Sequence, residues 1–314
     1  MRFAELRGQE NVRNLLTEQA VSGLVNHAYI FCGQDGIGKF SVAEGFARMI
    51  MCEAPGRDGS ACGRCKSCLM HDSGSNPDIK IYDIPQGKTS IPVDMIRELN
   101  SDAITAPLYS RRKVYVIRHS EAMKAEAQNA LLKTLEEPPS YVTIILLCSN
   151  ISAMLPTITS RTARLDFARY TEAEIRQALE DRGLACDDMG PVLAYADGII
   201  GRAIDFLGDP ETGNIASEIL EIARGLKAGN TAFRLKSADY IGKMKEKKEL
   251  VFFTLLTFYR DAAVTARYGS CGAMGYYEAQ KCLEIVEKAW VRIRQNTNYN
   301  LAVSAMLIQL QEVL

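Results

Sequence analysis

The sequence has almost no net charge, no long apolar run and no apolar segment near its N-terminus. Its 314 residues include 37 Lys+Arg and 38 Asp+Glu, so the formal net charge is −1. Such a chain has no overall field that attracts nucleic acid or anionic lipid, and contact with either requires a local patch or a partner. No run of about 18 apolar residues is present, and residues 1–16 are charged where a signal peptide is apolar. We therefore expect a cytoplasmic protein without membrane contact.

Nine cysteines are many for a reducing compartment, where structural disulfides are rare. Four of them lie within seventeen residues, and five are scattered along the chain. The clustered four are Cys52, Cys62, Cys65 and Cys68, and the scattered five are Cys32, Cys148, Cys186, Cys271 and Cys282. We interpret the scattered cysteines as small buried apolar residues.

The clustered cysteines supply four thiolates, the number that a closed structural Zn²⁺ site takes. The loop at 55–60 is polar and glycine-rich, so a metal would provide folding energy that apolar burial does not. An iron–sulfur cluster and unliganded thiols are the alternatives, although no further Cys-Pro stands at ferredoxin spacing. His71 is a possible substitute ligand. We predict structural Zn²⁺ on Cys52, Cys62, Cys65 and Cys68.

Strand-like and helix-like segments alternate in the first half of the chain, which predicts an α/β layered domain with parallel strands. The expected strands are His27–Cys32, Ile79–Ile84, Lys113–Ile117, Val142–Cys148 and Arg164–Phe167, and the expected helices between them are Lys39–Cys52, Val93–Ile104 and Ala122–Glu136. After about residue 168 only helical patterns remain, beginning with a capping box at Thr171 and Glu174. The charged run at 243–248 is read as a solvated turn between helices.

A glycine-rich segment after the first strand has the spacing of a phosphate-binding P-loop. Gly33, Gly36 and Gly38 let successive N–H groups face phosphate oxygens, and Lys39 would reach the β- and γ-phosphates. The next residue should carry a hydroxyl for Mg²⁺ but is Phe40. A plain strand-to-helix turn is the alternative interpretation.

The third expected strand lacks the acidic pair that a P-loop ATPase needs for Mg²⁺ and for the attacking water. Arg118 and His119 follow that strand instead. Two separate functions are thus missing, so ATP/Mg²⁺ hydrolysis is not expected, while nucleotide binding stays open because Lys39 and the loop remain.

These features together resemble a known family. A four-cysteine module after the P-loop helix, the segment AQNALLKTLEEPP at 127–139 and the segment LPTITSR at 155–161 are similar to the bacterial clamp-loader subunits of DNA polymerase III, which are AAA+ proteins. The resemblance implies an AAA+ domain at 1–168 with a zinc-binding insertion at about 50–72, a small helical lid domain at 169–210, and an all-α C-terminal domain at 211–314 that forms an oligomeric collar.

Within that family, the altered P-loop and the missing acidic pair make this sequence resemble the δ′ type of subunit rather than the ATP-hydrolysing γ/τ type. The resemblance implies a non-hydrolysing scaffold of the DNA polymerase III holoenzyme, in a hetero-pentamer with γ/τ and δ. It also implies indirect contact with the sliding clamp and with primer-template DNA. An ATP-hydrolysing γ/τ-type subunit or another P-loop ATPase is the alternative. A zinc-dependent DNA binder is a third reading, but Arg57, Arg64 and Lys66 are few for phosphate neutralisation.

The family also supplies roles for two arginines. In it a Ser-Arg-Cys motif delivers an arginine finger to the nucleotide of a neighbouring subunit, where a guanidinium stabilises charge on the transferring phosphoryl group. Here the motif reads Ser160, Arg161, Thr162, so the resemblance gives that role to Arg161, with a plain surface arginine as the alternative. Arg202 stands where relatives carry a sensor arginine of the lid, and is otherwise a relic or a salt-bridge former.

Overall fold

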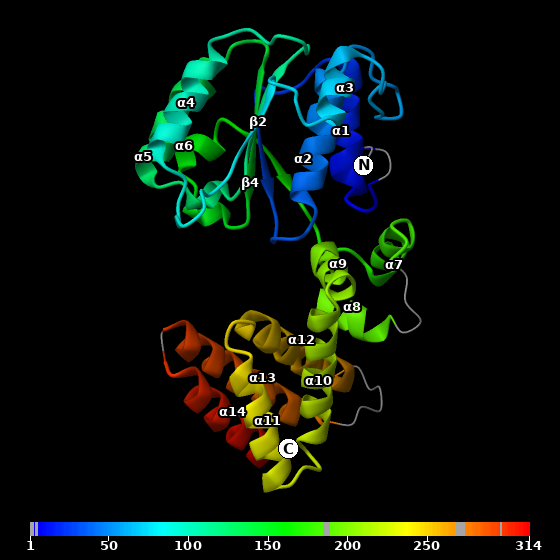
Figure 1. The fold of residues 1–314 in the computed structure, drawn as a ribbon, viewed down its shortest axis with the longest axis vertical. Coiled ribbons are helices and arrows are strands. Elements are labelled where there is room, and N and C mark those ends of the chain that lie inside the picture. Colours follow the sequence, from blue (N-terminus) through cyan, green and yellow to red (C-terminus); the bar gives the residue numbers. More distant parts are fainter. Residues whose placement is uncertain (1–2, 4–5, 185–188, 268–273, 296) are drawn as a thin grey trace. The chain divides into compact units, whose positions relative to one another are not determined.

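The computed structural model describes residues 3, 6–184, 189–267, 274–295 and 297–314 (Figure 1). It divides into two compact units, of which the first contains Met1–Ala178 and Gly198–Gly201, and the second contains Leu179–Asp197 and Arg202–Leu314. The expected three domains, with limits at residues 168 and 210, stay a prediction. Of the nine cysteines, Cys186 and Cys271 lie outside the described residues.

A five-stranded parallel sheet in the order β2-β3-β4-β1-β5 forms the centre of the first unit. Its strands are β1 (Ala28–Cys32), β2 (Ile79–Tyr82), β3 (Lys113–Ile117), β4 (Val142–Cys148) and β5 (Ala163–Asp166). All residues of β1, β3 and β4 are buried, whereas the edge strands β2 and β5 are partly exposed. The predicted α/β class is therefore confirmed, and each expected strand lies within two residues of the observed one.

Helices cover both faces of this sheet (Figure 1). On one side lie α1 (Glu10–Ser22), α2 (Lys39–Met51) and α3 (Lys66–Asp72), and on the other lie α4 (Val93–Ala103), α5 (Ala125–Glu136) and α6 (Pro156–Thr159). Leu99 and Leu131 pack with Ile144 in the core beneath α4 and α5. Tyr29 meets Phe46 of α2 edge-on, with ring centroids 5.3 Å apart. The sheet is thus the middle of three layers, which fixes its carboxyl edge as a rigid platform.

Two helix starts show how the local sequence sets the elements. Helix α5 begins three residues later than expected, because Ser120–Ala122 forms the short 3₁₀ helix η2 after β3. A second 3₁₀ helix, η3, spans Ile151–Ala153. At α7 (Glu172–Glu180), the predicted capping box is present: the N–H of Glu174 donates to Thr171 Oγ1 at 3.3 Å, and the N–H of Thr171 donates to Glu174 Oε2 at 2.7 Å.

The described elements of the second unit are helices, as the sequence predicted. They are α8 (Gly190–Ala196), α10 (Pro210–Gly225), α11 (Thr231–Lys243), α12 (Lys248–Arg267), α13 (Tyr276–Arg294) and α14 (Tyr299–Val313), together with most of α9 (Ile200–Gly208). Phe252 stacks on Trp290 at 5.2 Å between α12 and α13, and Cys282 is buried in the same core. Among the described helices, none is long and apolar enough to cross a membrane.

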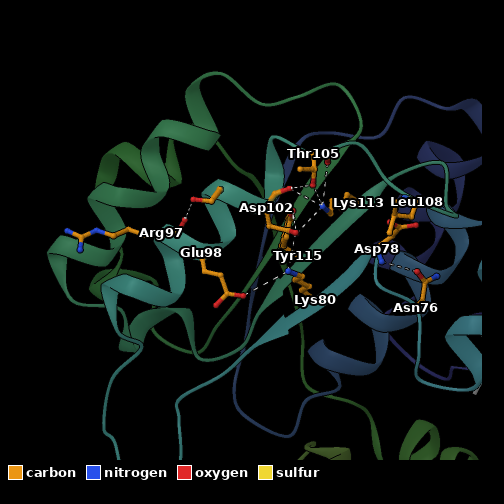
Figure 2. A network of polar contacts seen from close by, with 11 residues as sticks. Asn76, Asp78, Lys80, Arg97, Glu98, Asp102, Thr105, Leu108, Lys113 and Tyr115 are labelled. Atoms are coloured by element: carbon orange, nitrogen blue, oxygen red, sulfur yellow. Dashed lines mark hydrogen bonds and ion pairs between the residues drawn. The ribbon is translucent and has the colours of Figure 1, made fainter.

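A polar network holds the β2 edge of the sheet against α4 (Figure 2). Lys113 is 5% exposed, and its ammonium lies 3.0 Å from Asp102 Oδ2 and 2.7 Å from Thr105 Oγ1. The hydroxyl of Tyr115 donates to Asp102 Oδ2 at 2.8 Å, and Lys80 Nζ lies 3.1 Å from Asp102 Oδ1. One carboxylate therefore neutralises a buried lysine and satisfies a buried tyrosine.

A second carboxylate, Asp78, is 1% exposed just before β2. It accepts three backbone hydrogen bonds, from the N–H groups of Leu108, Tyr109 and Ser110, at 2.7, 2.7 and 2.8 Å. Because a carboxylate that accepts several N–H bonds orders the segment supplying them, Asp78 fixes the loop that leads into β3 (Figure 2).

Candidate functional site

The glycine-rich loop lies between β1 and α2, at the carboxyl edge of the sheet. The N–H of Gly33 donates to the carbonyl of Cys148 at 3.1 Å, which ties the start of the loop to the end of β4. Gly36 and Gly38 have φ values of +79° and +96°, a region that glycine enters without a Cβ penalty. The predicted strand, glycine turn and helix are therefore present, with the geometry that a P-loop requires.

Lys39 is turned into its own loop. Its side chain is buried, and the ammonium donates to the carbonyl of Gly33 and, at 3.0 Å, to that of Gln34. It also lies 3.3 Å from Asp35 Oδ1. In this structure the Lys39 ammonium is thus hydrogen-bonded to its own loop, in the way that it would otherwise bind a phosphate group.

The segment Gly198–Gly201 packs directly on the loop within the first unit. The N–H of Gly201 donates to the carbonyl of Gly36 at 2.9 Å. A Cβ at Gly201 would stand 2.8 Å from Gly36 Cα, and a Cβ at Gly36 would stand 3.0 Å from Ile199 Cγ2. Two backbones therefore touch at this point, and only glycine fits there.

Four side chains form one group beside the glycine-rich loop, in the region where a P-loop ATPase holds Mg²⁺: Phe40, Asp83, Arg118 and His119. The guanidinium of Arg118 lies over the Phe40 ring, 4.9 Å from its centroid, and pairs with Asp83 at 2.9 Å. His119 Nδ1 lies 2.8 Å from the other Asp83 oxygen. Burial acts to raise the pKa of Asp83, but the His119 hydrogen bond and the Arg118 charge outweigh it and hold that pKa below its ordinary value. Asp83 is engaged by Arg118 and His119, and the sequence did not predict it because it stands 36 residues before His119.

Glu121 is the acidic residue closest to this position along the chain. It lies in η2, and one carboxylate oxygen accepts a hydrogen bond from Ser149, which follows β4. Its other oxygen is buried and has no hydrogen-bond partner among the described residues. Glu121 therefore joins the ends of β3 and β4 and does not take the place held by Arg118 and His119.

The four clustered cysteines come together as predicted. Their sulfur atoms all lie within 4.8 Å of one another, and the pairs Cys62–Cys68 and Cys52–Cys65 are each 4.0 Å apart. Tetrahedral Zn²⁺ with Zn–S bonds of about 2.3 Å requires sulfur atoms about 3.8 Å apart, so the spacing fits this metal. Cys52 directly follows α2, Cys65 directly precedes α3, and Cys68 lies in the first turn of α3, so the module joins these two helices.

The environment of the sulfurs also suits a metal. Backbone N–H groups of Arg64 and Cys65 lower the pKa of Cys62 to about 6, whereas burial raises the pKa values of Cys52 and Cys68. Metal binding at this module would therefore displace protons from the buried thiols. His71, the possible substitute ligand, lies in α3 and is not part of the four-sulfur group, and burial lowers its pKa.

Arg161 lies between α6 and β5, with its side chain 38% exposed. Its Nη1 donates to the carbonyl of Thr157 at 3.1 Å and to Ser160 Oγ at 3.2 Å, and its Nη2 lies 3.1 Å from Glu136 Oε1. Thr162, which replaces the family's cysteine, donates its hydroxyl to the carbonyl of Ile158 at 3.2 Å. The turn is thus held by its own hydrogen bonds, and the guanidinium is anchored at the surface.

Arg202 belongs to the second unit, in α9. Its guanidinium lies over the ring of Phe253 in α12, 3.6 Å from the centroid. Tyr195 meets the same ring edge-on at 5.6 Å. Arg202 therefore has a packing role in this unit, and its assignment as a sensor stays a prediction.

The fold and the site define a parallel α/β protein with a P-loop-like turn, no acidic pair after β3, and a closed four-cysteine module. A family described as "DNA polymerase III, delta subunit" matches residues 8–171, more than half of the chain. The chain belongs to this family. The resemblance of the sequence to clamp-loader subunits of DNA polymerase III, which are AAA+ proteins, is confirmed.

Individual relatives carry related names. The chain is 34% identical to the DNA polymerase III subunit gamma/tau of Mycobacterium bovis, over 62% of this chain and 34% of the relative, so it spans about a third of that protein. It is 29% identical to the DNA polymerase III subunit delta′ of Bacillus subtilis, over 81% of this chain and 76% of the relative. Among solved structures, a DNA polymerase III gamma subunit-related protein of Thermotoga maritima aligns at 19% identity, with a TM-score of 0.49, over 96% of this chain and 98% of that one.

Proposed function

We propose that this chain is a δ′-type clamp-loader subunit that does not hydrolyse ATP. The observation that carries the proposal is the cluster of Phe40, Arg118 and Asp83 at the end of the sheet. The hydroxyl and the acidic pair that would hold Mg²⁺ are replaced by an aromatic ring and by a cation already paired with a carboxylate. A guanidinium in that region repels a divalent cation, so both metal and water activation are lost.

The role that the chain keeps is to supply Arg161 to a neighbouring ATPase subunit of the γ/τ type. Its side chain lies at the surface, and contacts of Nη1 with Thr157 and Ser160 and of Nη2 with Glu136 engage three of the five guanidinium N–H groups. The remaining two are donors for phosphate oxygens of another subunit. The structural Zn²⁺ on the four cysteines braces α2 against α3 and takes no part in chemistry, because four thiolates close its coordination shell.

The proposed partners are γ/τ-type subunits and a δ subunit in a hetero-pentamer. The gamma/tau and delta′ names of the relatives support this assignment. In such an assembly this subunit helps to load the sliding clamp onto primer-template DNA, and it touches DNA and clamp mainly through its neighbours.

The test is reconstitution of the loader with Arg161→Ala and, as a matched control, Arg164→Ala. Arg164 lies three residues further along, and its ion-pair partner among the described residues is Asp166 on the same strand, at 2.7 Å. We expect Arg161→Ala to reduce the DNA-dependent ATPase of the loader by about 10³-fold, the lower range for an arginine finger, and Arg164→Ala to leave it unchanged. Equal rates for both variants would remove the finger assignment.

The second candidate, an ATP-hydrolysing γ/τ-type subunit, is favoured by the intact glycine turn and Lys39. It is tested by phosphate release from the isolated chain with ATP and Mg²⁺, and by the same assay on Phe40→Thr. We expect neither protein to turn over, because the threonine hydroxyl restores one metal ligand while Arg118 and His119 remain. Turnover near one per second by the unmodified chain would favour the ATPase.

A further inference from the structure

The second unit contains a basic cavity that the proposed function does not use. Its volume is about 340 Å³, at the lower end of the range for ligand sites. Lys245 and Lys248 line it together with the polar residues Thr297, Asn298 and Asn300. The lysines come from the turn before α12 and from its first residue, and the polar residues come from the start of α14.

The lysines at 243–248 fall into two groups, those that form ion pairs with carboxylates of described residues and those that do not. Lys243 pairs with Asp239 at 2.7 Å, and Lys247 lies 2.8 Å from Glu211 and 3.7 Å from Asp209. Lys245 and Lys248, which face the cavity, form no ion pair with any residue that the structure describes. The residues described as lining the cavity include no carboxylate either. Two like charges without a counter-ion share one hollow, an arrangement that a bound anion would stabilise.

The positive charge continues beyond the cavity. Arg292 and Arg294 stand on either side of Ile293, which lines the cavity, in the last turn of α13. Both are exposed, and neither has an ion-pair partner in the part of the chain that the structure describes. The two lysines that line the cavity and these two arginines next to a lining residue together exceed the charge that a single phosphate group neutralises, which favours a ligand with several phosphates in a row.

The lining suits phosphate rather than bases. The aromatic residue there, Tyr299, is buried and donates its hydroxyl to the carbonyl of Ile241 at 3.2 Å, so it offers no face for stacking. Ammonium, hydroxyl and amide groups are instead the donors that bind phosphate oxygens. We propose that this cavity, with Lys245 and Lys248 at its centre, binds the phosphodiester backbone of a nucleic acid strand without reading its sequence.

The experiment uses the full chain and a fluorescein-labelled oligothymidylate, with anisotropy measured between 50 and 200 mM salt. The pocket variant is Lys245→Ala/Lys248→Ala, and the control is Lys236→Ala/Lys281→Ala, which removes the same charge from exposed positions of α11 and α13. Circular dichroism checks that each variant folds. We expect the pocket variant to bind about tenfold more weakly than the control, with a salt slope shallower by about 1.4, because each single-strand phosphate contact contributes about 0.7.

Three results would overturn the proposal. The first is equal affinity of the pocket and control variants, and the second is a salt slope that does not change. The third is binding of inorganic phosphate, measured by calorimetry and lost in the pocket variant, without any binding of the oligonucleotide. That result would assign the cavity to a free phosphate ion instead of a nucleic acid strand.

Discussion

Glu136 Oε1, at the end of α5, lies 3.1 Å from Arg161 Nη2. The guanidinium proposed to reach a neighbouring nucleotide is therefore oriented by a carboxylate of its own subunit, which comes from the segment LLKTLEEPP. An exposed ion pair of this kind contributes at most about 1 kcal/mol, so it orients the side chain more than it stabilises the fold.

For this pair we predict that Glu136→Ala lowers kcat of the reconstituted loader by about two- to fivefold, much less than Arg161→Ala. Glu136→Gln should recover most of the rate, because an amide oxygen still accepts from the guanidinium. Glu137→Ala, at the exposed neighbouring position, is the control. If Arg161→Ala abolishes ATPase while both Glu136 variants behave like the control, Glu136 has no orienting role.

Asp102 is predicted to carry much of the stability of the β2 edge. Asp102→Asn leaves the buried ammonium of Lys113 without its counter-charge, and we expect a loss of about 3 kcal/mol in the free energy of unfolding. Asp94→Asn, which removes an exposed ion pair with Arg97, should cost less than about 0.5 kcal/mol. Urea titration measures both, and equal midpoints for the two variants would contradict the assignment.

The same carboxylate predicts a pH dependence. Burial acts to raise the pKa of Asp102, but hydrogen bonds from Tyr115, Lys113 and Lys80 outweigh it and hold this pKa below its ordinary value. Its contribution to stability is therefore complete above the unfolded pKa of about 3.9 and is lost as the pH falls through the lower folded pKa. Acid titration of unfolding should show a smaller loss in this range for Asp102→Asn than for the unmodified chain.

The cysteine module is predicted to hold about one zinc per chain. Cys68→Ser should lose the metal and lower the melting temperature, because the polar loop that bears the cysteines has little apolar surface of its own to bury. Cys282→Ser, at a buried position in the second unit, should keep its zinc even if it is less stable. Plasma mass spectrometry of the purified chains measures the metal. Iron with visible absorption would identify an iron–sulfur cluster, and a metal-free native protein would leave four free thiols.

The backbone contact between Gly36 and Gly201 within the first unit predicts a sharp difference between Gly201 and Gly208. Gly201→Ala puts a Cβ 2.8 Å from Gly36 Cα and should destabilise the chain by about 1 to 3 kcal/mol. Gly208→Ala, where a Cβ meets nothing within 4 Å, should be neutral or stabilising. Thermal unfolding of the two variants compares them directly. Equal melting temperatures would mean that the backbones at Gly36 and Gly201 move apart without a loss of folding free energy.

The sequence predicted those features that depend on short segments. The apolar runs gave the strands to within two residues, the glycine spacing gave the P-loop turn, and the cysteine spacing gave the four-sulfur group. Helix α3 was missed because it contains Cys68 and directly follows Cys65, so the segment was interpreted as part of the metal-binding insertion. Cys32, Cys148 and Cys282 are buried as expected.

The partners of the site residues were not predictable in the same way. Asp83 meets His119 across 36 positions, and the packing of Arg202 on Phe253 spans two helices of the second unit. Such contacts depend on the tertiary arrangement of the strands and helices, which a local pattern in a single sequence does not predict. The unpaired lysines in the run at 243–248 are a further case, because composition does not show which lysines are neutralised.

The strand order has a consequence for the newly made chain. Strand β1 pairs with β4 and β5, and more than a hundred residues separate the end of β1 from the start of β4. At about 5 to 20 residues per second, β1 waits at least 5 s on the ribosome before either neighbour exists. The four cysteines, by contrast, are all made within seventeen residues. Metal capture can therefore precede sheet formation, so that the segment joining α2 and α3 is fixed before the neighbours of β1 have been synthesised.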